Sequence, residues 1–529
     1  MSAKTSLQRD FQNSLQTSIQ HHRRGAGGIR IALALAERLD VLVRTLYRHN
    51  DDPGKHHLAL VALGGYGRKE LCFSSDTDIM FLLSSDADIS AGGQTAKALL
   101  HTFLDIGLNV GHSFRTIPDC LELAGSDHES WISLLESRFL CGNRSAYNEF
   151  KTGLKSTIRT GNARKFTGEL LARIEQRHQK YGNSTKLLEP NVKNSSGGLR
   201  DLHAVLWLLA GTRMYPAPVP IPAGETALSS LLASSPMKKK FHPQLLNAAR
   251  KALDHLLRTR NEMHVQAAGL HDTLEFTFQR KVAEGLGYRA KGHRSSVEQF
   301  MQHYYVAARV IATLQRRARG VVERTFVVSS PGGSTTTLDA QFALREHRLY
   351  ARGSRIRYTN SIVLRAFLHE AENVARLSDE LEDGIVRNLG RLTPLRSREE
   401  TALFRRFLNL PKGMADSLQK MNDLGILARW IPEWKPMVAF FQHNQYHYYT
   451  ADEHTLMVCV SLESLADSPS AFGKVYRSLP RRDTLVLAAL LHDIAKPHRV
   501  GDHEVAGVAI AEKVLKRLRY DDVVKDVVF

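Results

Sequence analysis

The chain has 529 residues, of which 43% are hydrophobic and 24% charged, and its formal net charge is +18. This composition is typical of a globular protein with several domains and excludes a disordered or fibrous chain. No apolar run reaches the length of about 18 residues that a membrane-spanning helix needs, and the scattered cysteines exclude a zinc ribbon or a disulfide scaffold. The polar N-terminal stretch lacks the apolar segment of a signal peptide, so we expect a cytoplasmic protein.

The positive charge predicts attraction to polyanions, which include nucleic acid, a nucleoside triphosphate and an acidic protein. No RNA-binding motif with interleaved aromatic residues occurs, so a nucleic-acid partner is not indicated. A solvated basic surface explains the charge equally well.

Residues 1–50 have apolar positions at helical spacing and predict helices, followed by a turn at 51–54. Residues 58–63 are continuously apolar and predict a buried strand, which leads into Gly64 and Gly65. Asp76 and Asp78 follow, and a second apolar run at 79–83 predicts the next strand. Glycines allow the backbone to approach a ligand closely.

Asp76 and Asp78 are two residues apart, so in a strand they would project from the same face. Two such carboxylates are ligands that Mg²⁺ prefers, and a pair of metal ions would hold the attacking and leaving oxygens of a phosphoryl-type transfer. The alternative is a polar turn that Asp76 caps. Residues 95–106 predict a helix and 108–116 a strand. A third carboxylate stays open, because Asp105 precedes that strand and Asp119 follows it.

Residues 189–202 combine Lys193, Gly197-Gly198 and Arg200 ahead of a helix that we expect over 200–209. A helix N-terminus after Gly-Gly, with two fixed cations, predicts an anion site, and a flexible surface loop is the alternative. Residues 213–240 predict an irregular linker. Residues 242–320 predict helices on which Arg260 and His264 lie one turn apart, and 321–358 predict a small sheet or hairpin that includes the runs 321–322 and 326–328.

Histidines gather near the end of the sequence. His454 lies near the end of a run that precedes a predicted helix. The adjacent pair His492 and Asp493 follows the apolar run 485–491, and His503 comes 11 positions after His492. Imidazole and carboxylate ligands suit a divalent transition metal, which can activate water for phosphoester hydrolysis.

The glycine turn and aspartate pair resemble the polymerase beta-type nucleotidyltransferases. In its form G-R-x-E-L…S-D-x-D, with E-P-N-x-K…G-G-L-R-D-L downstream, the chain is similar to the bacterial enzymes that uridylylate the PII protein, and H…HD resembles the HD phosphohydrolase domain. This resemblance implies an α+β fold with a polymerase beta-like core containing a small mixed sheet, a helical middle domain and an all-α HD domain. We expect segments at 1–54, 55–150, 151–320, 321–435 and 436–529.

The resemblance implies transfer of UMP from UTP to a tyrosine of the PII signalling protein, with Mg²⁺ at Asp76 and Asp78. It also implies a uridylyl-removing activity at an HD site that holds a divalent metal such as Mn²⁺ or Fe²⁺. The residues that it assigns to the nucleotide are Gly64, Gly65, Arg68, Ser75, Lys193 and Arg200, and those that it assigns to the HD metal are His454, His492, Asp493 and His503.

The family also has two glutamine-sensing ACT domains and a distal HD aspartate. Asp521, Asp522 and Asp526 come too early for that aspartate, so we expect the sequence to stop before the end of the HD domain. Two other classes stay open. One is an RNA-directed transferase such as a tRNA CCA-adding enzyme, and the other is a non-catalytic module that binds PII.

Overall fold

The computed structural model describes the chain except for residues 1–2, 51–52, 109, 161–162, 213, 217, 292–293, 327–334, 354–355, 442–448, 499–502 and 521–529. The chain divides into two compact units. The first is formed by Met1–Thr185, Glu189–Arg289 and Gln299–Val328, and the second by Lys186–Leu188, Ala290–Glu298 and Ser329–Phe529. Both contain many helices and one small sheet, which confirms the expected α+β class. None of the described helices is both long and apolar enough to cross a membrane.

The sheet of the first unit has the strand order β3-β2-β1-β4. Strand β1 pairs antiparallel with β2 and β4, and β2 pairs parallel with β3, so the sheet is mixed as predicted. Every residue of β1 is buried, because helices cover both of its faces. The strands are β1 (Leu58–Leu63), β2 (Thr77–Leu83), β3 (Val110–Thr116) and β4 (Arg138–Gly142).

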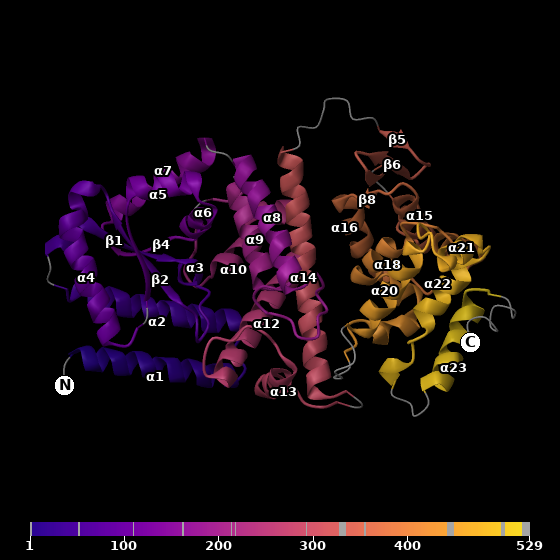
Figure 1. The fold of residues 1–529 in the computed structure, drawn as a ribbon, viewed down its shortest axis with the longest axis horizontal. Helices are drawn as coiled ribbons and strands as arrows, with labels where there is room; N and C mark the ends of the chain where they lie inside the picture. The colour runs from indigo at the N-terminus through magenta and orange to yellow at the C-terminus, as the bar shows by residue number, and fades with distance from the viewer. Residues whose placement is uncertain are drawn as a thin grey trace. The chain divides into compact units, whose positions relative to one another are not determined.

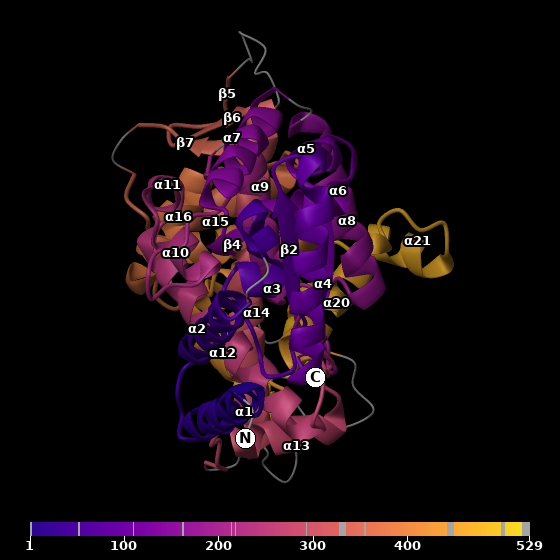
Figure 2. The same cartoon turned by 90° about the vertical axis from the view of Figure 1, so that its left-hand side faces the viewer.

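Helices α2 and α4 supply the apolar side chains against one face of this sheet, while α5 and α7 lie on the other side (Figure 1). Helix α2 also packs against α1 and α12 (Figures 1 and 2). These helices are α1 (Ala3–Arg23), α2 (Gly28–Arg48), α3 (Gly64–Gly67), α4 (Ile89–Asp105), α5 (Ile117–Ser126), α6 (His128–Leu135) and α7 (Arg144–Thr160).

Further helices follow the sheet in the sequence and complete the first unit. They are α8 (Ala163–Tyr181), α9 (Leu199–Gly211), α10 (Ala227–Ala233), α11 (Ser235–Lys240), α12 (Pro243–Ala267), α13 (Phe276–Gly285) and α14 (Ser296–Phe326). Two predictions are wrong here. The segment expected as an irregular linker contains α10 and α11, and the run expected as β-like at 321–322 and at Phe326 lies in α14. Residues 327–328, which belong to the same prediction, lie outside the described residues.

The second unit contains the sheet β5-β6-β7-β8, of which β5, β6 and β7 lie in the region 321–358 where a small sheet was predicted and β8 lies beyond it. Its strands are β5 (Thr336–Thr337), β6 (Phe342–Arg345), β7 (Arg348–Ala351) and β8 (Arg376–Leu377). All described residues of this unit after β8 form helices or connecting segments, which agrees with the expected all-α HD region.

One apolar core joins the small sheet to these helices, with Trp430 and Trp434 among its fully buried side chains. The longer helices are α15 (Asn360–Glu372), α16 (Asp379–Arg387), α17 (Arg398–Leu408), α18 (Met414–Asp423), α19 (Leu427–Trp430), α20 (Ala451–Ser464), α21 (Ala471–Ser478), α22 (Arg482–Leu491) and α23 (His503–Arg517).

Candidate functional site

The aspartate pair lies at the start of β2. Asp76 is exposed and directly precedes the strand, whereas Asp78 is its second residue and is half-buried. In the sheet Asp78 lies opposite Leu63 of β1 and Gly111 of β3. Burial and then the nearby Asp76 carboxylate raise the pKa of Asp78, as expected for two carboxylates that share one site.

Glycines make room for the Asp78 carboxylate on both sides. A Cβ at Gly111 would lie 2.3 Å from Asp78 Oδ1, and a Cβ at Gly64 would lie 3.1 Å from Asp78 Oδ2. Gly64 also has a φ of +55°, a conformation that L-residues with a side chain seldom adopt. Gly65 is different, because no atom would lie closer than 3.9 Å to a Cβ there. The backbone beside Asp78 is therefore open enough for a ligand.

A third carboxylate is not provided by β3, where the residue opposite Asp78 is Gly111. Asp119, one of the two sequence candidates, instead caps helix α5, since Thr116 N–H donates to Asp119 Oδ2 at 2.9 Å. The other candidate, Asp105, is the last residue of α4.

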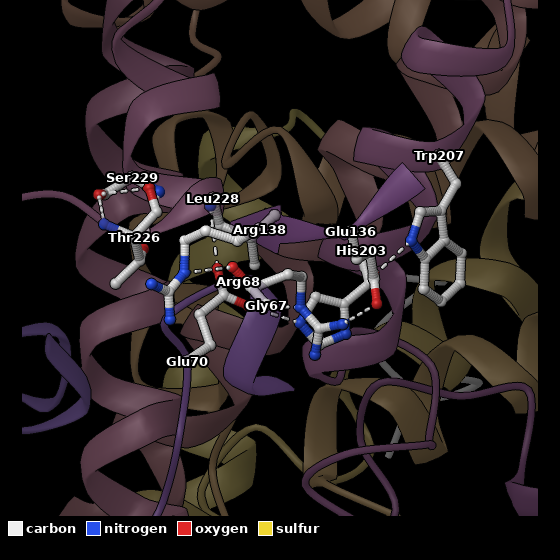
Figure 3. Close-up of polar contacts among 10 residues, drawn as sticks. All are labelled: Gly67, Arg68, Glu70, Glu136, Arg138, His203, Trp207, Thr226, Leu228 and Ser229. Atoms are coloured by element: carbon white, nitrogen blue, oxygen red, sulfur yellow. Dashed lines mark hydrogen bonds and ion pairs between the residues drawn. The ribbon is translucent and has the colours of Figure 1, made fainter. Parts of the chain in front are cut away.

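Arg68 belongs to a buried polar network (Figure 3). Its guanidinium contacts Glu70 Oε2 at 2.9 Å and Glu136 Oε2 at 2.5 Å, and its exposed fraction is 6%. Burial alone would lower the pKa of Arg68, but the carboxylates of Glu136 and Glu70 raise it. Because it pairs with two carboxylates, Arg68 supports the glycine turn, and its charge still acts on Asp78.

The same network ties two later helices to the glycine turn (Figure 3). Glu70 accepts hydrogen bonds from Leu228 N–H of α10 at 2.9 Å and from His203 Nε2 of α9 at 2.9 Å. Burial, followed by nearby Arg68, lowers the pKa of His203 far below its usual value, so its ring is neutral and Nε2 carries the proton. Trp207 donates to Glu136 Oε1 at 2.6 Å.

Ser75 closes the turn that precedes the aspartate pair. Its Oγ accepts from Cys72 N–H at 2.8 Å, and its own N–H donates to Cys72 O at 3.0 Å. These contacts fix the loop between the glycine turn and β2.

Lys193 brings positive charge to the aspartate pair, and Arg200 lies near Lys193. Lys193 is partly buried, and its charge acts on Asp78. Burial and then nearby Arg260 and Arg200 lower the pKa of Lys193, and no described carboxylate forms an ion pair with it. Burial and then nearby Arg68 likewise lower the pKa of Arg200, whose guanidinium lies over the Trp207 ring. Such crowded cations favour an anionic ligand.

The amide groups at the start of α9 already donate to acceptors within the protein, so the predicted anion site at this loop depends on the cations and stays a prediction. Gly197 N–H donates to Asp201 Oδ2 at 2.7 Å, Leu199 N–H to Val192 O at 3.0 Å, and Arg200 N–H to Lys193 O at 2.9 Å. An anion here would be bound by the side chains of Lys193 and Arg200.

The second unit holds a group of potential metal ligands. One ligand atom each from His454, His492 and Asp493 lies within 4.8 Å of the others. His454 is in α20, rather than in the segment before that helix, and His492 and Asp493 directly follow α22. His492 Nδ1 contacts Ala489 O at 2.7 Å, which leaves Nε2 directed at Asp493 Oδ2, 3.2 Å away.

Lys496 is the other partner of this group, with Nζ 2.6 Å from Asp493 Oδ2. Burial alone would raise the pKa of Asp493, but hydrogen bonds from His492 and Lys496 lower it to about 2. Two imidazoles and an ionised carboxylate are a donor set that fits a divalent transition metal. His503 begins α23, but its side chain lies outside the described part of the chain, as do Asp521, Asp522 and Asp526.

Comparison with known protein families gives two matches. The family GlnD PII-uridylyltransferase matches residues 165–318, and the HD domain family matches residues 451–528. In this order, the two matches correspond to a PII uridylyltransferase–HD architecture. These matches indicate an enzyme of nucleotidyltransferase and hydrolase type.

The PII-uridylyltransferase match covers Lys193 and Arg200, whereas Asp76 and Asp78 lie before its first residue, at the start of β2. The HD match covers all three clustered ligands. Glu70 is part of the motif G-R-x-E-L but had no predicted role, and Glu136, His203 and Trp207 were not predicted at all. A single buried carboxylate produces no periodic pattern in the sequence. The charged residues within G-R-x-E-L are the one local sign that Glu70 is unusual for a turn.

Proposed function

We propose that the first unit transfers UMP from UTP to a tyrosine hydroxyl of the PII protein. The observation that carries this proposal is the aspartate pair at the start of β2, which lies between two glycines and under the charge of the partly buried Lys193. Carboxylates and a cation in one place suit a nucleoside triphosphate with its metal. The PII-uridylyltransferase match favours a protein acceptor over RNA.

Asp76 and Asp78 would hold Mg²⁺, since both offer hard oxygen ligands and Gly64 and Gly111 leave the space that Asp78 needs. When bound, the metal would supply charge neutralisation at the α-phosphate and make the acceptor hydroxyl easier to deprotonate.

The chain's own residues bind and orient the reactants. Lys193 and Arg200 bind the phosphates, and the glycine turn brings the backbone close to them. The tyrosine oxygen forms a bond to the α-phosphorus, its proton leaves to solvent, and the bond to the bridging oxygen breaks. Pyrophosphate departs with the electron pair, and UMP stays on the tyrosine. Holding the two oxygens in line supplies most of the rate enhancement that this reaction needs.

The test is Asp78→Asn with Asp119→Asn as the matched control. Asp78→Asn removes a charge that faces the site, whereas Asp119→Asn removes one at the N3 position of α5, where the amide oxygen of Asn can still accept from Thr116 N–H. We expect Asp78→Asn to lower transfer by at least on the order of 1000-fold and Asp119→Asn to change it by less than about threefold. Full transfer by Asp78→Asn would refute the metal assignment.

A second activity is favoured by the clustered His454, His492 and Asp493. We propose that they hold a divalent metal such as Mn²⁺ or Fe²⁺ and hydrolyse the UMP–tyrosine bond. Water would be the nucleophile, and Lys496 lies where it can neutralise charge on the phosphate.

A further inference from the structure

One turn of α12 faces the loop that precedes the aspartate pair. Arg260, Asn261 and His264 are all buried on this turn, with exposed fractions of 7%, 0% and 2%. Three polar side chains on one buried turn need partners, because an unpaired buried polar group costs free energy. Asn261 and His264 have their partners in the loop before the aspartate pair, and Arg260 is connected to the Lys193 loop through Asp272.

Asn261 and His264 accept hydrogen bonds from two consecutive amides of the aspartate loop. Phe73 N–H donates to Asn261 Oδ1 at 3.1 Å, and Ser74 N–H donates to His264 Nδ1 at 3.1 Å. A backbone N–H can only donate, so Nδ1 of His264 carries no proton. The ring proton is therefore on Nε2, which lies 3.5 Å from Asp272 Oδ1.

Arg260 connects the same turn to the Lys193 loop through Asp272. Arg260 Nε contacts Asp272 Oδ1 at 2.7 Å, and the main-chain oxygen of Asp272 accepts from Val192 N–H at 2.8 Å. Val192 directly precedes Lys193. One helical turn thus holds both the loop before Asp76 and the loop that carries Lys193.

The Asn261 contact has a cost. Its Nδ2 is buried without a hydrogen-bond partner among the described residues. A residue kept only to fill space would avoid that cost. The acceptor Oδ1, which holds Phe73 N–H, is the part of the side chain that the structure uses.

We propose that Asn261 and His264 are positioning residues, which fix the Asp76–Asp78 pair relative to Lys193. This inference rests on the proposed transferase function. Neither residue touches the reacting atoms in this account, and both act through the backbone of Phe73 and Ser74. Because misplacing reacting groups by about 1 Å can cost on the order of 100-fold in rate, the effect of their loss should exceed that of a single hydrogen bond.

Two variants of one residue provide the test. His264→Asn places an amide oxygen near the former Nδ1 and can still accept from Ser74 N–H. His264→Gln has the same chemistry but places its polar end near the former Nε2, so it should lose that contact. Hydrogen–deuterium exchange of residues 71–76 reports on the loop without any need for activity. Transfer kinetics and the Mg²⁺ concentration for half-maximal rate report on the site.

We expect His264→Asn to keep exchange and kcat within about threefold of the unaltered protein. His264→Gln should exchange on the order of tenfold faster and lose on the order of 10- to 100-fold in kcat. It should also need more Mg²⁺, with little change in KM for UTP. Equal behaviour of the two variants, or a loss of thermal stability that accounts for both, would overturn the proposal.

If neither His264 variant folds, Asn261→Asp and Asn261→Leu ask the same question at Phe73, because only the first keeps the acceptor oxygen. An unaltered protein that transfers no nucleotide would refute the proposed function alone. The exchange comparison would then still decide whether these side chains hold the loop.

Discussion

At the scale of single residues, the site depends on where side chains are absent. Gly111 lies opposite Asp78, and a Cβ there would come within 2.3 Å of the carboxylate. Gly65 has no such neighbour, since the nearest atom would be 3.9 Å away. Replacing each of the two glycines by alanine is therefore expected to have a different effect.

Gly111→Ala should displace the Asp78 carboxylate and lower kcat on the order of 100-fold, while the exposed strand β3 stays folded. Steady-state transfer kinetics with circular dichroism as the fold check measure this. Unchanged kcat would show that the Asp78 carboxylate does not need its present place.

Gly65→Ala should leave the thermal unfolding temperature unchanged, because the added methyl group meets no close neighbour. If the triphosphate lies against this backbone, KM for UTP should rise by about tenfold, a change equivalent to about 1.4 kcal/mol of binding. An unchanged KM would place the triphosphate elsewhere.

Lys193 contributes positive charge to the proposed site, although its surroundings in the folded protein disfavour that charge. Burial and the nearby cations Arg260 and Arg200 lower its pKa, so the fold disfavours its charged form. Lys193→Met should therefore not lower stability, yet it should raise KM for UTP by about tenfold through the lost charge on the phosphates. Denaturant unfolding and UTP titration, run on the same preparation, separate the two effects. Lost stability with unchanged KM would contradict this assignment.

At the scale of elements, β1, β2 and several helices followed from apolar runs and spacing, whereas β4 was not predicted. Strand β1 is continuously apolar because helices cover both faces of the sheet, and β2 begins at Thr77, between the two aspartates. Helix α10 could not be predicted in this way. Its segment is rich in proline and serine, and its start is stabilised by distant Glu70, which accepts from Leu228 N–H.

The site was predictable in part, for a related reason. The aspartate pair and the Lys193 loop each form a local pattern, so the sequence pointed to both. Arg260 and His264 were expected one turn apart on a helix, but the contact of that turn with the aspartate loop was not predictable, because Asn261 is 188 positions from Phe73 and His264 is 190 from Ser74. For Arg68, the local motif suggested a role that its contacts do not match. The motif suggested that Arg68 binds a phosphate, whereas its partners are two buried carboxylates.

Asp201 determines how the Lys193 loop joins α9. It is fully buried, and it accepts from Arg177, His178 and Gly197 N–H. Burial alone would raise its pKa, but His178 and Arg177 lower it overall. A carboxyl whose pKa is lower in the folded state adds stability above its unfolded pKa of about 3.9 and loses it as the pH falls below that value.

Asp201→Asn should therefore cost about 3 kcal/mol of unfolding free energy at pH 7, since it leaves Arg177 without its buried partner. The difference from the unaltered protein should shrink below about pH 4, where the aspartate begins to protonate. Denaturant unfolding at a series of pH values measures both. A difference that grows toward acid pH would contradict this sign.

At the scale of the whole molecule, each unit carries its own candidate site. The residues proposed for transfer lie in the first unit, and His454, His492 and Asp493 lie in the second. The two proposed activities, which form and break the same bond, depend on residues in different units, so they should be separable by mutation.

His492→Ala should abolish removal of UMP from the modified protein, on the order of 1000-fold, and leave the transfer rate within about twofold. Manganese binding, measured by calorimetry, should weaken in parallel, whereas Asp78→Asn should leave that binding to the second unit unchanged. Loss of transfer in His492→Ala would show that the activities depend on one shared site.

The most direct test of the central claim offers labelled UTP, ATP and CTP with Mg²⁺ to the chain, with purified PII protein and bulk tRNA side by side. We predict label from UTP on PII, on a tyrosine, and none from Asp78→Asn. Label on tRNA, or on PII equally from all three nucleotides, would contradict the assignment of this chain as a PII uridylyltransferase.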